Sequence, residues 1–186
     1  KIYPPILYDN TADTLTRRMT LLNDVNPVLV SPSKWLANKV KQSKLNMSCK
    51  VIPNGIDLNK FVNIPKKIAR KKLGYSQDEN LLLYVANGGL LSTYKDGATM
   101  LESFRIVRSN FSKKVKLIVA GGFGGIPSDL QESIIEVGKI RQEEMNQYYC
   151  AADMLVFPTK ADNLPLVLIE ALACGTPIIT VDIGGC

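Results

Sequence analysis

From about Leu81 onward, short hydrophobic runs alternate with stretches in which hydrophobic residues recur at helical spacing. The runs predict strands over residues 81–86, 115–120, 154–158 and 177–181. The helical spacing predicts helices over residues 98–108, 128–136, 142–152 and 165–174, and residues 137–140 form a short extended piece. The predicted strands are largely continuous in hydrophobic residues, which is typical of parallel strands covered on both faces. We therefore predict an α/β fold with a Rossmann-like, doubly wound parallel sheet.

The segments that follow the predicted strands are the first places to look for a site. In a doubly wound sheet, ligands bind beyond the carboxyl ends of the strands, which directs attention to residues 87–95, 121–125 and 159–163. The glycines within these segments do not form the G-x-G-x-x-G fingerprint of dinucleotide binding. They fit flexible turns at least as well as ligand contacts.

The first 60 residues follow a different pattern. Residues 27–31 are predicted to form a strand, Ser33 is a suitable N-cap for the helix that follows, and residues 46–64 form a connection with a turn at residues 53–55. We expect a domain boundary near Cys49. Residues 1–48 would be the tail end of a preceding domain with its linker, and residues 49–186 a second domain, incomplete at its C-terminus. Both chain ends are interpreted as cuts within a longer protein.

Composition and charge narrow the classes of function. Hydrophobic residues make up 46% of the 186 residues and charged residues 22%, as in ordinary globular proteins. The net charge of +6 is concentrated in residues 60–72 and 113–116. Such a surface is either simply solvated or attracts phosphates or an anionic membrane. Aromatic residues are not interleaved with these clusters, which argues against nucleic acid as a partner.

The cysteines and the absence of histidine restrict the chemistry further. The four cysteines have no C-x-x-C spacing and the chain contains no histidine, so a zinc site is not expected. A Ser-His or Cys-His catalytic pair is excluded within this chain. Scattered cysteines fit reduced thiols of a cytoplasmic protein.

Glu170 is the most unusual residue, because it is the only charge in the hydrophobic stretch 164–174. A helix with so little polar surface is expected to be buried nearly all round, with Asp162 or Asn163 as its cap and Pro165 in its first turn. An unpaired buried carboxylate costs several kcal/mol. Glu170 therefore needs hydrogen-bond donors, either hydroxyl groups of a sugar or a lysine or arginine in a structural salt bridge. The residue pattern alone leaves both open.

A resemblance to a known family favours the first alternative. Asp162, seven intervening residues, Glu170 and then Ala-Leu-Ala-Cys-Gly-Thr-Pro resemble the E-x7-E signature region of retaining glycosyltransferase family 4. Residues 31–36, residues 51–57 and Phe61 resemble that family's interdomain passage, and residues 148–159 resemble the segment before the signature. The resemblance covers most of the chain from Val28. It implies the C-terminal, donor-binding half of a GT-B fold, in which two Rossmann-like domains face each other across a cleft.

The family's two signature carboxylates carry over by position as the catalytic residues. Glu170 would bind the ribose hydroxyls of a nucleotide-sugar donor, and Asp162 would contact hydroxyls of the donor sugar. The family usually has Glu where this chain has Asp162, and the shorter side chain could change the sugar that is accepted.

The remaining donor contacts also follow from the resemblance. Lys95 matches the diphosphate-binding lysine, although an exposed loop lysine is the alternative. The backbone N–H groups around Asn163, Leu164 and Leu166 would favour the negative phosphate and sugar end of the donor. The segment Gly138, Lys139 and Ile140 aligns with the region near the base.

One departure concerns the diphosphate. The arginine that often precedes the family's lysine has no counterpart in residues 87–94. Arg17, Arg18 or a residue of the missing half could compensate. No metal or other cofactor is expected.

The resemblance implies part of a hexosyltransferase that moves a sugar from a nucleotide-diphosphate sugar to an acceptor sugar or lipid-linked sugar, with retention, in polysaccharide or glycolipid synthesis. It would act in the cytoplasm or peripherally at the inner membrane face. The alternatives are a GT-B sugar-nucleotide epimerase and a non-catalytic Rossmann-like module. The chain alone is expected to be inactive, because the N-terminal acceptor domain is missing.

Overall fold

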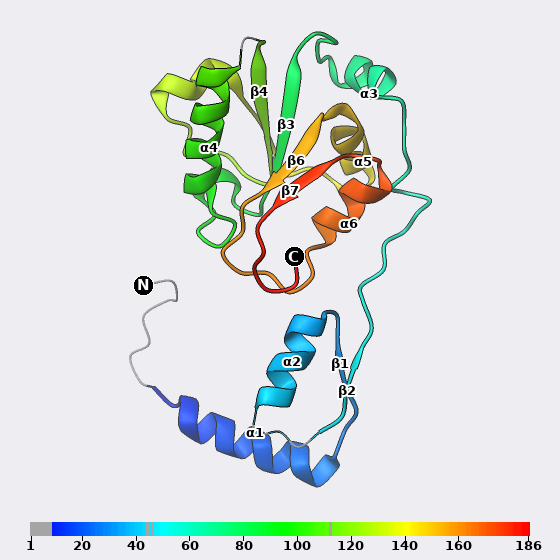
Figure 1. The fold of residues 1–186 in the computed structure, drawn as a ribbon, viewed down its shortest axis with the longest axis vertical. Coiled ribbons are helices and arrows are strands. Elements are labelled where there is room, and N and C mark those ends of the chain that lie inside the picture. Colours follow the sequence, from blue (N-terminus) through cyan, green and yellow to red (C-terminus); the bar gives the residue numbers. More distant parts are fainter. Residues whose placement is uncertain (1–8, 44, 46, 112) are drawn as a thin grey trace.

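The computed structural model describes residues 9–43, 45, 47–111 and 113–186. Its elements form an N-terminal unit within residues 9–51 and a C-terminal unit within residues 65–186 (Figure 1). Residues 52–64 connect the two units without forming a helix or a strand. The carboxyl ends of the strands in the C-terminal unit point toward the N-terminal unit (Figure 1).

The C-terminal unit contains a five-stranded parallel sheet in the order β5-β4-β3-β6-β7. The strands are β3 (Asn80–Val85), β4 (Val115–Ala120), β5 (Ile134–Gly138), β6 (Met154–Phe157) and β7 (Ile178–Thr180). Helix α4 (Gly97–Asn110) covers one face, and α3 (Lys66–Leu73), α5 (Gln142–Ala151) and α6 (Leu166–Ala173) lie on the other (Figure 1). This arrangement confirms the predicted doubly wound α/β fold.

The hydrophobic core is divided between the two faces of the sheet. Leu81 and Leu83 of β3 pack in the cluster beneath α5 and α6, whereas Tyr84 packs with Met100 and Phe104 of α4. Neighbouring residues of one strand are therefore buried on opposite sides. This two-sided burial explains why the strands are hydrophobic runs rather than alternating patterns.

The predicted helix over residues 128–136 is wrong. Residues Ser128–Ser133 form a 3-10 helix, η2, and strand β5 begins at Ile134. β5 pairs with β4 along one edge of the sheet, and its β-branched residues suit a strand better than a helix. A second 3-10 helix, η1 (Gly89–Leu91), lies in the loop after β3.

Two expectations about α6 are also wrong. Its N-cap is Pro165, which makes no side-chain capping bond, so neither Asp162 nor Asn163 caps the helix. Leu172 is 59% exposed, so α6 is not buried all round. The face that carries Glu170 is nevertheless buried, because it packs toward α5 and the sheet.

The N-terminal unit consists of α1 (Thr11–Val25), β1 (Leu29–Ser31), α2 (Lys34–Gln42) and β2 (Cys49–Val51). Ser33 caps α2 as predicted, since its hydroxyl accepts the N–H of Leu36 at 3.2 Å. β1 pairs in parallel with β2, so the first part of the predicted connection 46–64 is in fact a strand. The boundary expected near Cys49 thus coincides with the start of β2, and the division into domains stays a prediction.

The connection is anchored to the C-terminal unit by Phe61. This side chain is 2% exposed and contacts Tyr149 of α5 edge-on, with 6.1 Å between ring centroids. Just after it, the N–H of Val62 donates to Asn146 Oδ1 at 3.1 Å, and the N–H of Ile64 donates to Cys150 Sγ at 3.4 Å. The connection therefore joins the core beneath α5 before α3 begins.

Arg70 of α3 ties three elements together and is only 3% exposed. Its guanidinium donates to the Ala151 carbonyl at 2.9 Å and to Asp153 Oδ2 at 2.7 Å. Asp153 also accepts the N–H of Leu81 at 2.8 Å and Lys66 Nζ at 2.6 Å. Burial by itself would raise the pKa of Asp153, but these hydrogen bonds and charges hold the pKa below its usual value.

Replacing Arg70 by methionine should lower the free energy of unfolding by about 1–3 kcal/mol, because Asp153 and the Ala151 carbonyl lose a buried donor while Lys66 still pairs with Asp153. Urea unfolding followed by circular dichroism measures the change. Arg105→Met is the matched control, since Arg105 pairs with Asp129 at an exposed position. An equal loss in both variants would contradict the role assigned to Arg70.

Candidate donor-binding site

A cavity of about 340 Å³ lies at the carboxyl ends of β3 and β4, bordered by α5 and α6. Its lining includes Asn87 after β3, Gly121 after β4 and Glu170 of α6. Gly121 has a φ of +111°, and a Cβ at this position would lie 2.0 Å from the Ala86 carbonyl oxygen. Only glycine allows the two strand ends to approach so closely. The cavity therefore lies where the sequence predicted a ligand site.

Glu170 is 7% exposed and lines this cavity. Its Oε2 accepts a hydrogen bond from the Tyr149 hydroxyl at 2.6 Å. Among the described residues, no lysine or arginine forms an ion pair with Glu170 and no other side chain hydrogen-bonds to it. The structural salt bridge considered from the sequence is therefore not formed within the described part of the chain.

Tyr149 is the site residue that the sequence analysis missed. Its side chain is completely buried, and burial raises its pKa, with a further increase from the neighbouring Glu170 carboxylate. The phenol is thus kept protonated and serves as a donor. Helical spacing gives a partial signal, because Met145 and Tyr149 lie one turn apart on the buried face of α5.

Lys95 and Asp162 form an ion pair, in which Lys95 Nζ contacts Asp162 Oδ2. Both side chains are partly buried, and Lys95 Nζ also lies 4.8 Å from the centroid of the Phe157 ring. The second oxygen of Asp162 accepts the N–H of Asn163 at 2.9 Å. Lys95 is therefore not an exposed loop lysine, and two residues predicted to contact different parts of a donor lie side by side.

The loop that carries Lys95 is fastened on both sides of that residue. The Tyr84 hydroxyl donates to the Lys95 carbonyl at 3.0 Å, and the Tyr94 carbonyl accepts the N–H of Lys160 at 2.8 Å. Lys160 Nζ also lies 3.0 Å from Asp96 Oδ1, and Asp96 caps α4. These contacts join the loop after β3 to the loop after β6, so Lys95 and Asp162 are positioned together.

The other predicted donor contacts fall into two groups. Lys139 and Ile140 line the cavity with Glu170, while Gly138 is buried and its carbonyl accepts the N–H of Gly121 at 2.7 Å. Asn163 and Leu164 lie in the loop before α6, Leu166 is the first residue of that helix, and none of the three lines the cavity. Within the described part of the chain, the N–H of Leu166 has no hydrogen-bond acceptor, as is usual in the first turn of a helix.

Residues 79–186 match the family described as glycosyl transferases group 1, and the chain belongs to this family. It is 34% identical to the alpha-monoglucosyldiacylglycerol synthase of Streptococcus pneumoniae, over 85% of this chain and 38% of that protein. It is 33% identical to a D-inositol 3-phosphate glycosyltransferase of Thermobispora bispora, over 73% of this chain and 35% of the relative. The chain thus spans little more than a third of the length of these relatives.

Solved structures show the same fold. Sucrose-phosphate synthase from Thermosynechococcus elongatus superposes with a TM-score of 0.73 at 24% identity, over 97% of this chain and 47% of that one. The Anabaena protein HepE, in complex with UDP and glucose, gives a TM-score of 0.70 at 19% identity, over 94% of this chain and 50% of that one. The C-terminal unit accordingly has the Rossmann-like fold of the C-terminal half of GT-B proteins.

Among the described helices, none is both long enough and hydrophobic enough to span a bilayer. Across residues 9–43, 45, 47–111 and 113–186, no group of three or more cysteine, aspartate or glutamate side chains is arranged to hold a metal ion.

Lys95→Met, Asp162→Asn and the double variant form a double-mutant cycle, measured by urea unfolding. The loss of stability in the double variant should differ from the sum of the two single losses by about 1–3 kcal/mol, because the two side chains are in direct contact and partly shielded from water. The exposed pair Arg141 and Glu144 is the control, and its two substitutions should be nearly additive. Additive effects of the Lys95 and Asp162 substitutions would contradict the ion pair.

Proposed function

We propose that this chain is the donor-binding half of a retaining glycosyltransferase of family 4, which takes a nucleotide-diphosphate sugar as its donor. The observation that carries the proposal is the environment of Glu170. A buried carboxylate that opens on a strand-end cavity, with one neutral donor and no cation among its described neighbours, still needs donors. The hydroxyl groups of a ribose would satisfy this requirement.

The contacts suggest how the donor would lie. The base would occupy the part of the cavity near Lys139 and Ile140, and the ribose would lie against Glu170. The diphosphate would approach Lys95, and the sugar would extend toward Asp162. Each group matches the chemistry of its proposed neighbour, since carboxylates accept hydrogen bonds from hydroxyl groups and a lysine attracts phosphate.

Lys95 would supply the main electrostatic contribution to the reaction. When the bond between the anomeric carbon and the diphosphate breaks, negative charge builds on the leaving nucleoside diphosphate, and a nearby ammonium group stabilises it. The acceptor hydroxyl forms the new bond to the same carbon, and its proton passes to an oxygen of the departing diphosphate. We propose that this step needs no metal ion and that the diphosphate competes with Asp162 for Lys95.

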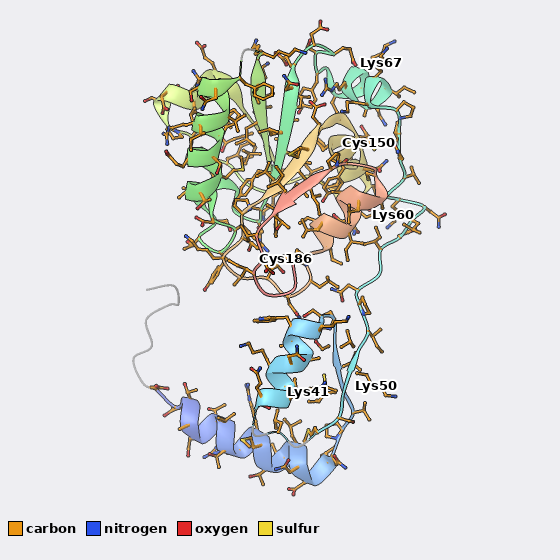
Figure 2. All side chains as sticks on the ribbon, in the orientation of Figure 1. Lys41, Lys50, Lys60, Lys67, Cys150 and Cys186 are labelled. Carbon is orange, nitrogen blue, oxygen red and sulfur yellow. The ribbon has the colours of Figure 1, made fainter. Side chains whose placement is uncertain are left out.

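The acceptor and the cellular setting are part of the same proposal. The acceptor would be a sugar or a lipid-linked sugar, held by the N-terminal domain of the complete protein. The similarity to an alpha-monoglucosyldiacylglycerol synthase, whose name indicates a glycolipid product, supports this. Lys60 and Lys67 lie on the side of the molecule where the connection and α3 run (Figure 2). Such a basic surface would favour peripheral contact with an anionic cytoplasmic membrane face.

Glu170→Gln should weaken nucleotide binding by about 10–100-fold, which corresponds to the loss of a hydrogen bond to a charged group. Isothermal titration of the full-length protein with UDP, GDP and ADP measures it. Glu132→Gln, at an exposed position of η2, should leave binding unchanged. If the unmodified protein bound none of the three nucleotides at millimolar concentration, the proposed function would be wrong.

Tyr149→Phe should weaken binding of the same nucleotide by about tenfold, because Glu170 loses the donor that fixes its orientation. The KM for the donor should rise by a similar factor, with a smaller change in kcat. Tyr148→Phe is the matched control, since the Tyr148 hydroxyl makes no hydrogen bond with the described residues. Equal effects at both tyrosines would contradict the role of Tyr149.

Product analysis separates the remaining alternatives. A sugar-nucleotide epimerase would return an epimerised nucleotide sugar without forming a new glycosidic bond. A non-catalytic module would bind nucleotide and leave the donor intact.

A further inference from the structure

One hydrogen bond joins the N-terminal unit directly to the loop before α6. The Ser33 hydroxyl donates to Asn163 Oδ1 at 2.5 Å, although the two residues are 130 positions apart. Ser33 is buried, and its oxygen at the same time accepts the N–H of Leu36 as the cap of α2. The sequence predicted the capping role of Ser33 but not its contact with the loop.

The loop at residues 162–164 is held from two sides. On the N-terminal side, Asn54 Nδ2 donates to the Leu164 carbonyl at 3.4 Å, beside the bond from Ser33. On the other side, the N–H of Gly185 donates to the Asp162 carbonyl at 3.2 Å. A Cβ at Gly185 would lie 1.6 Å from the Asn163 carbonyl oxygen and 2.8 Å from Ser33 Cβ. Ser33, the loop and Gly185 are therefore in close contact.

The contact between Ser33 and the loop at residues 162–164 affects how the carboxylate of Asp162 is held. One oxygen of Asp162 contacts Lys95, and the other accepts the N–H of Asn163. Under the proposed function, a diphosphate draws Lys95 toward itself and weakens the first restraint. The bond from Asn163 then remains, and Ser33 fixes the side chain of that same asparagine.

We infer that Ser33 is a positioning residue for the loop at residues 162–164. Through its hydrogen bond to Asn163, the N-terminal unit fixes this loop and thereby the orientation of Asp162. The inference rests on the proposed function. It assigns to Ser33 an effect on alignment of the sugar rather than on binding of the nucleotide, because Ser33 does not line the cavity that contains Glu170. The two units are thereby coupled at the point where the sugar would be held.

The decisive variant is Ser33→Gly, because glycine is an adequate helix N-cap but cannot donate the hydrogen bond. In the full-length protein, kcat for release of nucleoside diphosphate from UDP-glucose, GDP-mannose or ADP-glucose should fall about tenfold, the expected effect of one lost hydrogen bond. Affinity for the free nucleotide should change less than about twofold. Ser33→Thr keeps the hydroxyl and should retain kcat.

Asn163→Ala should lower kcat to the same extent, and the double variant Ser33→Gly/Asn163→Ala should be no worse than either single variant. Ser43→Ala is the structural control. Ser43 ends α2 and donates to the Val40 carbonyl at 2.6 Å, far along the helix from the loop. Its kcat should not change. Equal losses in Ser43→Ala and Ser33→Gly, or a loss confined to nucleotide affinity, would overturn the inference.

Amide hydrogen exchange gives a second measurement that needs no turnover. In Ser33→Gly, exchange at residues 163–168 should accelerate several-fold relative to the unmodified protein, while exchange in β3 and β4 stays the same. Unchanged exchange at residues 163–168 would refute the inference whatever the activity. Absence of turnover and nucleotide binding in the unmodified protein would instead refute the proposed function.

Discussion

The site depends on the hydrogen bond between the Tyr149 hydroxyl and the Glu170 carboxylate. A charge inside a hydrophobic helix is stable only if polar neighbours replace the water that it loses. Tyr149 provides one such neighbour and adds no charge, so the carboxylate is not neutralised by a protein cation among the described residues. The Glu170 side chain also lines the strand-end cavity, from which further hydrogen-bond donors can reach its carboxylate. The packing of α5 against α6 thus places the carboxylate where, under the proposed function, the ribose hydroxyls of the donor would bind.

The second part of the site is built from two loops that are bonded to each other. The loops after β3 and β6 are joined through the Tyr94 carbonyl and through Lys160 and Asp96. Lys95 and Asp162 belong to these two loops, and their opposite charges form an ion pair. Under the proposed function, a diphosphate would compete with Asp162 for this already positioned cation.

Local sequence patterns predicted the elements in which hydrophobic runs or helical spacing of hydrophobic residues indicate a buried face. The hydrophobic runs of β3, β4 and β6 were sufficient because every residue in them is buried or half-buried. The spacing in α4 was sufficient because Met100 and Phe104 lie on its buried face. β5 was predicted only at its C-terminal end, within the extended piece 137–140, because Glu136 interrupts its hydrophobic run; that carboxylate accepts the N–H of Gly124 at 2.7 Å. The three-residue strand β2 was missed because it exists only through its pairing with β1.

Lys95, Asp162 and Glu170 of the candidate site could be predicted because they belong to recognisable sequence motifs. Their partners could not be predicted in this way. Tyr149 lies 21 positions from Glu170, and Ser33 lies 130 positions from Asn163, so no local spacing relates them. Contacts of this kind depend on how α5, α6 and α2 pack in three dimensions.

The anchoring of Phe61 has a mechanical consequence for the whole molecule. Its ring packs against Tyr149, and the backbone immediately after it is bonded to α5. If the two units rotate relative to each other, the connection must bend before Phe61, because Phe61 and Val62 are fixed to α5. The tyrosine that orients Glu170 therefore sits beside the fixed end of the connection, where its bending produces the least displacement.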